Sequence, residues 1–144
     1  MFGSSCLTVD ITLVAPPRLG QSLQLTVASG WYGSNGKSGQ SLLHTGVSNS
    51  HYAGLTLPFD TSILTKPGVF KSCGFLYTSI DVVLAMPGGR PYSGPTPLPL
   101  SIPIPNDPSL LGVSFYQQAL IFMRDNLPEP ILALGRGAHG VIGN

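Results

Sequence analysis

The sequence predicts an all-β fold: an antiparallel two-sheet β-sandwich with jelly-roll-like or Greek-key connections, formed by a single domain over residues 1–144. Only 9% of the residues are charged, against roughly 25% in ordinary soluble proteins. The 18 glycines and 14 prolines supply many turns, and apolar residues recur at alternate positions between those turns. A chain of this length buries roughly two thirds of its unfolded surface, so we expect it to fold without a metal.

Residues 95–108, which read PTPLPLSIPIPNDP, have the most regular pattern in the chain. Proline at every second position of a strand removes the N–H donors from one lateral side, because successive N–H groups point to opposite sides. We therefore expect an edge strand. Its inward face should carry Leu98, Leu100, Ile102 and Ile104, and its donor-free edge, facing solvent or a loop, should carry Pro97, Pro99, Pro103 and Pro105. The alternative is an extended polyproline II segment.

The other predicted strands are short and lie between turn signals. Their β-rich runs cover residues 7–14, 23–27, 42–43, 52–57, 75–86, 113–123, 131–134 and 141–142. The connections are too short for parallel crossovers, so we expect antiparallel pairing. One short helical turn is expected near residues 108–111, because Asp107 can cap it, Pro108 suits the first helical position and Gly112 ends it.

Charge and hydropathy argue against two classes of partner. The formal net charge is +1 and the seven Lys and Arg residues are scattered, so we expect no nucleic-acid partner. No apolar run approaches the roughly 20 residues of a membrane helix, so we expect no membrane insertion. A surface this poor in charge suits secreted or multimeric proteins.

The two cysteines, Cys6 and Cys73, are too few and too far apart for a zinc knuckle. They form either one long-range disulfide, which would add about 4 kcal/mol on the chain-entropy model, or two buried thiols. His44, His51 and His139 form a metal site only if they converge in space. We expect no metal and no cofactor.

Two patterns suggest catalysis or nucleotide binding, and each has a structural explanation that we prefer. Residues 135–140, GRGAHG, match the dinucleotide fingerprint, but four residues remain after the last glycine, so no helix can follow to bind a pyrophosphate. We expect a glycine-rich β-turn or bulge there. Asp60 and Asp81 could pair as general acid and base, but Asp60 looks like a turn or Asx cap and Asp81 like a strand-surface residue. The chain is therefore not expected to be an enzyme.

A turn-rich loop holds the candidate ligand-binding residues. Trp31 and Tyr32, with Asn35 and Lys37, combine aromatic faces with hydrogen-bonding groups, as sugar-binding sites do. The structural alternative is that Trp31 caps the core at one end of the sandwich.

The order of these motifs resembles a C-terminal β-rich domain found repeatedly in large secreted proteins of planctomycetes and some myxobacteria. The matching elements cover nearly the whole chain: Pro17-Arg18-Leu19-Gly20, Leu57-Pro58-Phe59-Asp60, Pro67-Gly68 with Cys73, Ser79-Ile80-Asp81, IPIPNDP at 102–108, and Phe115-Tyr116-Gln117-Gln118. Two positions depart from the pattern: Cys73 precedes Gly74 instead of following a glycine, and Gly135-Arg136-Gly137 replaces a Ser-Asn-Gly-like turn. The resemblance implies a secreted, non-catalytic accessory module and suggests a Cys6–Cys73 bridge.

Together these observations predict a non-catalytic structural or interaction module that is secreted or displayed on the cell surface. We expect it to form a homo-oligomer or to join a larger cell-surface or matrix assembly. The alternative function is carbohydrate binding through the Trp31-Tyr32 loop, with a glycan as the partner.

Overall fold

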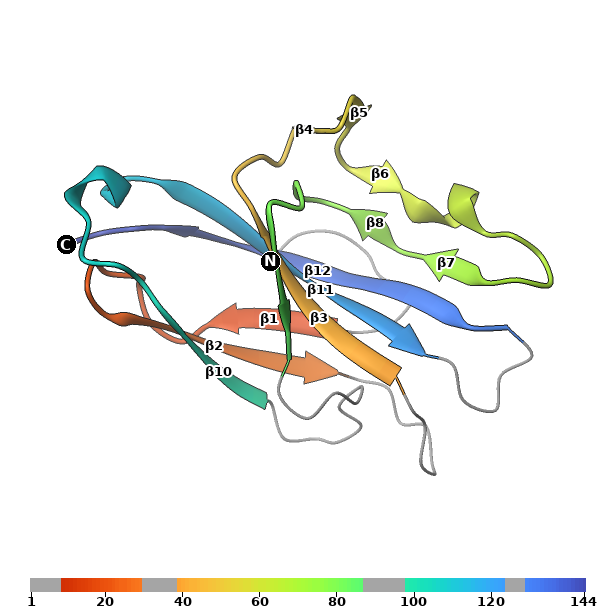
Figure 1. Ribbon diagram of the computed structural model, residues 1–144, viewed down its shortest axis with the longest axis horizontal. Helices are drawn as coiled ribbons and strands as arrows, with labels where there is room; N and C mark the ends of the chain where they lie inside the picture. Colours follow the sequence, from red (N-terminus) through yellow and green to blue (C-terminus); the bar gives the residue numbers. More distant parts are fainter. Residues whose placement is uncertain (1–8, 30–38, 87–97, 124–128) are drawn as a thin grey trace.

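The computed structural model describes residues 9–29, 39–86, 98–123 and 129–144, and it is a β-sandwich (Figure 1). A three-stranded sheet has the order β1-β2-β10 and consists of β1 (Val9–Leu13), β2 (Ser22–Ser29) and β10 (Leu98–Pro103). A five-stranded sheet has the order β7-β12-β11-β3-β9 and consists of β7 (Lys71–Cys73), β12 (Ile131–Val141), β11 (Ser114–Met123), β3 (Gly39–Gly46) and β9 (Val82–Ala85). The predicted all-β class is confirmed.

The two sheets are wound in the manner of a jelly roll. In the three-stranded sheet β10 pairs antiparallel with β2, and in the five-stranded sheet β9 pairs antiparallel with β3. Since β3 follows β2 in the chain and β10 follows β9, an antiparallel ribbon passes from one sheet to the other. Each crossing therefore brings together segments that lie far apart in the sequence.

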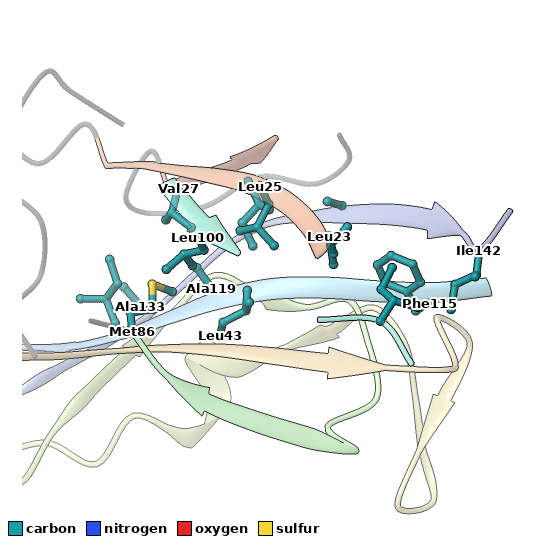
Figure 2. Close-up of a cluster of buried hydrophobic side chains, with 14 residues drawn as sticks. Leu23, Leu25, Val27, Leu43, Met86, Leu100, Phe115, Ala119, Ala133 and Ile142 are labelled. Carbon is teal, nitrogen blue, oxygen red and sulfur yellow. The ribbon is translucent and has the colours of Figure 1, made fainter. Parts of the chain in front are cut away.

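The main core fills the space between the two sheets. On β2 the alternation of Leu23, Leu25 and Val27 turns three side chains inward, and each is at most 4% exposed. They face Leu43, Ala119 and Ala133 of the five-stranded sheet (Figure 2). Burying one such large aliphatic side chain contributes roughly 1.5–3 kcal/mol, so this face carries much of the stability.

A smaller layer covers the outer face of the five-stranded sheet (Figure 1). It contains the hairpin β4 (His51–Tyr52) with β5 (Leu55–Thr56), the pair β6 (Phe59–Asp60) with β8 (Phe75–Leu76), and the 3-10 turn η1 (Thr61–Leu64). Leu57 and Leu76 of this layer pack against Leu134 of β12 in a second apolar cluster. β12 is therefore buried on both faces over this part of its length.

Strand β10 is the edge strand that the proline pattern predicts. It pairs with β2 alone among the described strands. The N–H of Ile104 donates to the carbonyl of Gln21 at 2.8 Å, so the alternation turns Pro99 and Pro103 away from β2. Both prolines are exposed, whereas Leu100 and Ile104 are each 9% exposed. Pro97 and the side chain of Leu98 lie outside the described residues.

The predicted helical turn is also confirmed. It is the 3-10 turn η2 (Pro108–Leu110), with Pro108 in its first turn and the Asp107 side chain accepting from the N–H of Ser109 at 2.9 Å. Gly112 follows it with φ of 78°, a left-handed conformation that glycine adopts without strain. Asp60 caps η1 in the same way, accepting from Ser62 N–H at 2.9 Å.

Two predicted strands are broken in the structure. Residues 75–86 form no single strand, because the chain leaves β8 after Leu76 and resumes pairing at Val82. The intervening Tyr77 N–H is held by the side chain of Gln118 instead of by a neighbouring strand. Residues 52–57 form a tight hairpin, since Ala53 and Gly54 take positive φ values of 48° and 82°.

Two expectations about the last strand are also wrong. β12 does not stop at Leu134 but continues through the glycine-rich residues to Val141. Strand β12 contains a bulge, since its register with β11 shifts between Gln118 and Leu120. Of the two predicted alternatives, a β-turn or a bulge, only the bulge is confirmed. Glycine suits this strand because a Cβ at Gly140 would lie 2.5 Å from Cζ of Phe115. In addition, β12 pairs in parallel with β7, so the pairing is not entirely antiparallel.

Candidate binding cleft

The two long sides of the sandwich differ. On one side β1 lies against β12, where Nε of Arg136 lies 3.1 Å from Oδ1 of Asp10. This ion pair is partly exposed and is not aligned as a hydrogen bond, so it contributes less than about 1 kcal/mol. On the other side the edge strands β9 and β10 belong to different sheets and do not pair. Among the described residues, no strand closes the sandwich along this β9–β10 seam.

A cleft of about 380 Å³ occupies the open side. Val82 and Leu84 of β9 line one wall, and Ile102 of β10 with Ile104, which follows that strand, lines the other. Strand alternation explains this arrangement, because Val82 and Leu84 pair with Thr45 and Leu43 and so share their inward face. The cleft reaches the end of the core where Leu23, Phe115 and Ile142 lie close together (Figure 2).

A second pocket of about 240 Å³ continues along the same seam. It shares Leu84 and Ile102 with the first and extends to Met86 and Pro99. Both β9 and β10 are therefore underpacked on their facing sides.

The floor of the larger cleft carries one polar side chain with an unused acceptor. Gln117 of β11 is 2% exposed and lines the cleft. Its Nε2 donates to Oγ1 of Thr45 at 3.3 Å, whereas its Oε1 has no hydrogen-bond partner. A buried unsatisfied acceptor costs roughly 1–3 kcal/mol. Its neighbours on the same strand face, Phe115 and Ala119, are both apolar and buried.

Gln118, the next residue, points to the opposite face and uses its whole hydrogen-bonding capacity. Its Oε1 accepts from Tyr77 N–H at 3.0 Å and from Nε2 of His44 at 3.2 Å. Its Nε2 donates to the carbonyls of Phe75 at 2.6 Å and Gly135 at 2.7 Å. Gln118 therefore ties the outer layer to the five-stranded sheet.

His44 is part of this internal network and is not available to a ligand. The side chain is 1% exposed, and burial lowers its pKa from 6.5 to about 4 despite the hydrogen bond to Gln118. The imidazole is neutral at pH 7, with Nε2 donating to the glutamine oxygen. His51 is exposed beside Ser50, and His139 stacks on Tyr116 with ring centroids 4.7 Å apart.

Asp60 and Asp81, the two carboxylates considered as an acid–base pair, each accept a backbone amide hydrogen bond, from Ser62 and Val47 respectively. Within the described ranges no group of three or more His, Cys, Asp or Glu side chains could hold a metal ion. Asp81 accepts from Val47 N–H at 2.9 Å and from the hydroxyl of Ser79 at 2.7 Å. These hydrogen bonds lower the pKa of its carboxyl, the Ser79 hydroxyl first and then the Val47 amide. Asp81 precedes β9, so its predicted place on a strand is wrong.

The predicted ligand-binding residues Trp31, Tyr32, Asn35 and Lys37 all lie outside the described residues. Glycan binding by that loop stays a prediction. Cys73 is not a free cysteine, but Cys6 lies outside the described residues, so the disulfide between them stays a prediction as well.

Sequence reasoning missed the cleft and Gln117. The signal was present in the sequence FYQQALIF, residues 115–122, where two adjacent amides interrupt an otherwise apolar strand. Adjacent strand residues face opposite sides, so one of the two amides had to enter each layer of the core. Buried amides need partners, and the structure provides a full set to Gln118 and an incomplete set to Gln117.

The fold and the seam define the molecule as a jelly-roll-like β-sandwich with an apolar cleft along one open side. No helix among the described residues is long and apolar enough to cross a membrane. No family model, no curated protein and no solved structure matches the chain. The resemblance to the domain of secreted planctomycete and myxobacterial proteins therefore stays a prediction.

Proposed function

We propose that this chain is a non-catalytic interaction module that associates with a second copy of itself through the free edge of β9. The supporting observation is that β9 is an edge strand with apolar side chains exposed on both faces. Val82, Val83 and Leu84 are 53%, 51% and 38% exposed. Edge strands of natural proteins usually carry a charge, a proline or a cover that prevents pairing, and β9 carries neither of the first two.

The free edge of β9 consists of the N–H and C=O groups of Val83 and Ala85. Met86 N–H donates to the carbonyl of Ser41 on β3 at 3.0 Å. Backbone groups of successive strand residues point to alternate sides, so the N–H and C=O of Leu84 also point toward β3. The N–H and C=O of Val83 and Ala85 point away from β3. Proline removes the donors of residues 99 and 103 from the outer side of β10 and leaves only that of Ser101, so of the two edges on the seam β9 is better able to accept another strand.

An antiparallel pair of two β9 strands is complementary to itself. With Leu84 opposite Leu84 of the second copy, Val83 lies opposite Ala85 and Val82 opposite Met86, so apolar residues meet throughout. The two five-stranded sheets then join into one continuous sheet about a two-fold axis. The paired segment is short, so we expect a weak, concentration-dependent dimer.

Light scattering coupled to size-exclusion chromatography over a concentration series tests this proposal. The unmodified protein should shift from monomer to dimer, and Leu84→Lys should stay monomeric, because two lysines would then face each other across the pair. Ile63→Lys is the control, since Ile63 is 69% exposed on η1, away from β9. An unmodified protein that stays monomeric at its highest soluble concentration refutes the proposal, as does a Leu84→Lys variant that still dimerises.

We place the module outside the cell. Support comes from Cys73, which is not a free cysteine, and from the low charge of the chain, since disulfides persist in oxidising compartments. The bridge proposed is Cys6–Cys73. Peptide mapping by mass spectrometry without reductant should recover these two cysteines in one linked pair of peptides, and recovery of both as free thiols would contradict the placement.

A further inference from the structure

We propose that the cleft beneath β9 binds a neutral small molecule with an aliphatic body and one hydroxyl group, a medium-chain alcohol being the simplest member of this class. The hydroxyl donates to Oε1 of Gln117, and the aliphatic body lies between Leu84 and Ile102. This site shares the side chains of Val82 and Leu84 with the proposed β9 interface, whereas the hydrogen bonds of that interface use the backbone groups of Val83 and Ala85.

The size and lining of the cleft support a small apolar ligand. Its volume of about 380 Å³ falls within the roughly 300–1,000 Å³ of typical ligand sites. Apart from Thr45 and Gln117, the residues that line it are apolar, and none of them carries a charge. An apolar ligand would bury surface that the sandwich itself leaves unpacked.

The chemistry of Gln117 selects the polar group of the ligand. Its amide nitrogen is already used by Thr45, so the unpaired group is the acceptor Oε1, which is itself buried, and the ligand reaches it when the Gln117 side chain turns toward the cleft. The ligand must therefore supply a donor. A hydroxyl does so without charge, whereas a carboxylate cannot donate and an ammonium would be buried with no countercharge.

The proportions of the site add a further restriction. Gln117 lies on β11, two strands inward from β9 in the order β11-β3-β9. Neighbouring strands are about 4.8 Å apart, so the acceptor is roughly 10 Å from the edge of the sheet. A ligand that bonds Gln117 and fills the cleft therefore has an extended chain behind its hydroxyl, which points to an alcohol of medium length.

Titration of the dilute, monomeric protein with 1-octanol tests the inference, with two probes as comparison. 1-Methoxyoctane has the same chain without a donor, and octanoate has a negative charge. Binding is followed by nuclear magnetic resonance, as shifts of backbone amide signals. We expect 1-octanol to bind about tenfold more tightly than the ether, which corresponds to one hydrogen bond of about 1.4 kcal/mol. Octanoate should bind more weakly than either.

Two variants separate the hydrogen bond from the cavity. Gln117→Leu should bind the alcohol and the ether equally, since the acceptor is gone and the space remains. Leu110→Trp should weaken both probes, because Leu110 lines the cleft and lies outside β9 and β11. The signals that shift should come from β9, β10 and β11. Equal binding of alcohol and ether by the unmodified protein, or no binding up to the solubility limit of 1-octanol, overturns the inference.

Discussion

Two substitutions of adjacent glutamines by leucine, Gln117→Leu and Gln118→Leu, should have different effects on the free energy of unfolding. Gln117 and Gln118 are 2% and 0% exposed on the same strand, so each substitution replaces a buried amide by an apolar side chain of similar size. They differ in their hydrogen bonds. Gln118 bonds four groups, and Gln117 has one long bond and an unsatisfied oxygen.

The expected magnitudes follow from the partners left behind. Gln118→Leu strands the N–H of Tyr77, Nε2 of His44 and the carbonyls of Phe75 and Gly135. At about 1 kcal/mol for each orphaned group, the low end of the usual range, the cost is roughly 4 kcal/mol. Gln117→Leu removes an unsatisfied acceptor and loses one bond of 3.3 Å, so we expect no loss or a gain of about 1 kcal/mol.

Urea unfolding followed by tryptophan fluorescence and far-ultraviolet circular dichroism measures both values. A natural domain has about 5–15 kcal/mol of stability, so the Gln118→Leu variant should unfold at a much lower urea concentration or be unfolded without urea. A shared loss of 3 kcal/mol or more in both variants would refute the reasoning, because Gln117 would then be fully satisfied and the cleft would have no open acceptor.

Two further predictions concern the buried histidine and the proline edge. The pKa of His44 is lowered in the folded protein from 6.5 to about 4. Between these pH values the folded state therefore binds fewer protons than the unfolded state. The free energy of unfolding should fall as the pH drops from 6.5 to 4, by up to about 3 kcal/mol. Urea unfolding at several pH values checks this, and His44→Gln should flatten the dependence; an unchanged slope in that variant would contradict the assignment. Replacing Pro99 and Pro103 together by threonine restores two N–H donors on the outer side of β10 and should raise aggregation, measured by static light scattering during storage. Equal aggregation of this variant and the unmodified protein would show that the prolines do not protect the edge.

Local patterns in the sequence predicted the elements that depend on local chemistry. The alternation of proline with leucine and isoleucine identified β10 as an edge strand, because donor loss and side-chain direction are both properties of the segment itself. The caps at Asp60 and Asp107 were predictable for the same reason, since each carboxylate bonds an amide two residues ahead. Such features require no knowledge of distant neighbours.

The features that the sequence did not reveal depend on distant partners. Residues 75–86 have the pattern of one strand, but Gln118, 41 positions after Tyr77, bonds that residue's N–H and breaks the run. The glycines of β12 suggested a turn or bulge, whereas the ring of Phe115, from the neighbouring strand β11, leaves no room for a side chain at Gly140. The cleft arises between β9 and β10, which belong to different sheets, so no single segment contains a signal for it.

The jelly-roll winding also determines when each edge of β2 is covered as the chain is synthesised. Val27 pairs with Leu98, so the inner strand of the three-stranded sheet must wait for its neighbour while some 70 residues are made, roughly 4 to 14 s at ordinary rates of synthesis. During that interval β2 has a bare edge, and that edge lacks proline. The prolines of β10 protect the finished molecule but not the nascent one, so the risk of misassociation should be greatest on the ribosome and should fall abruptly once residue 103 has emerged.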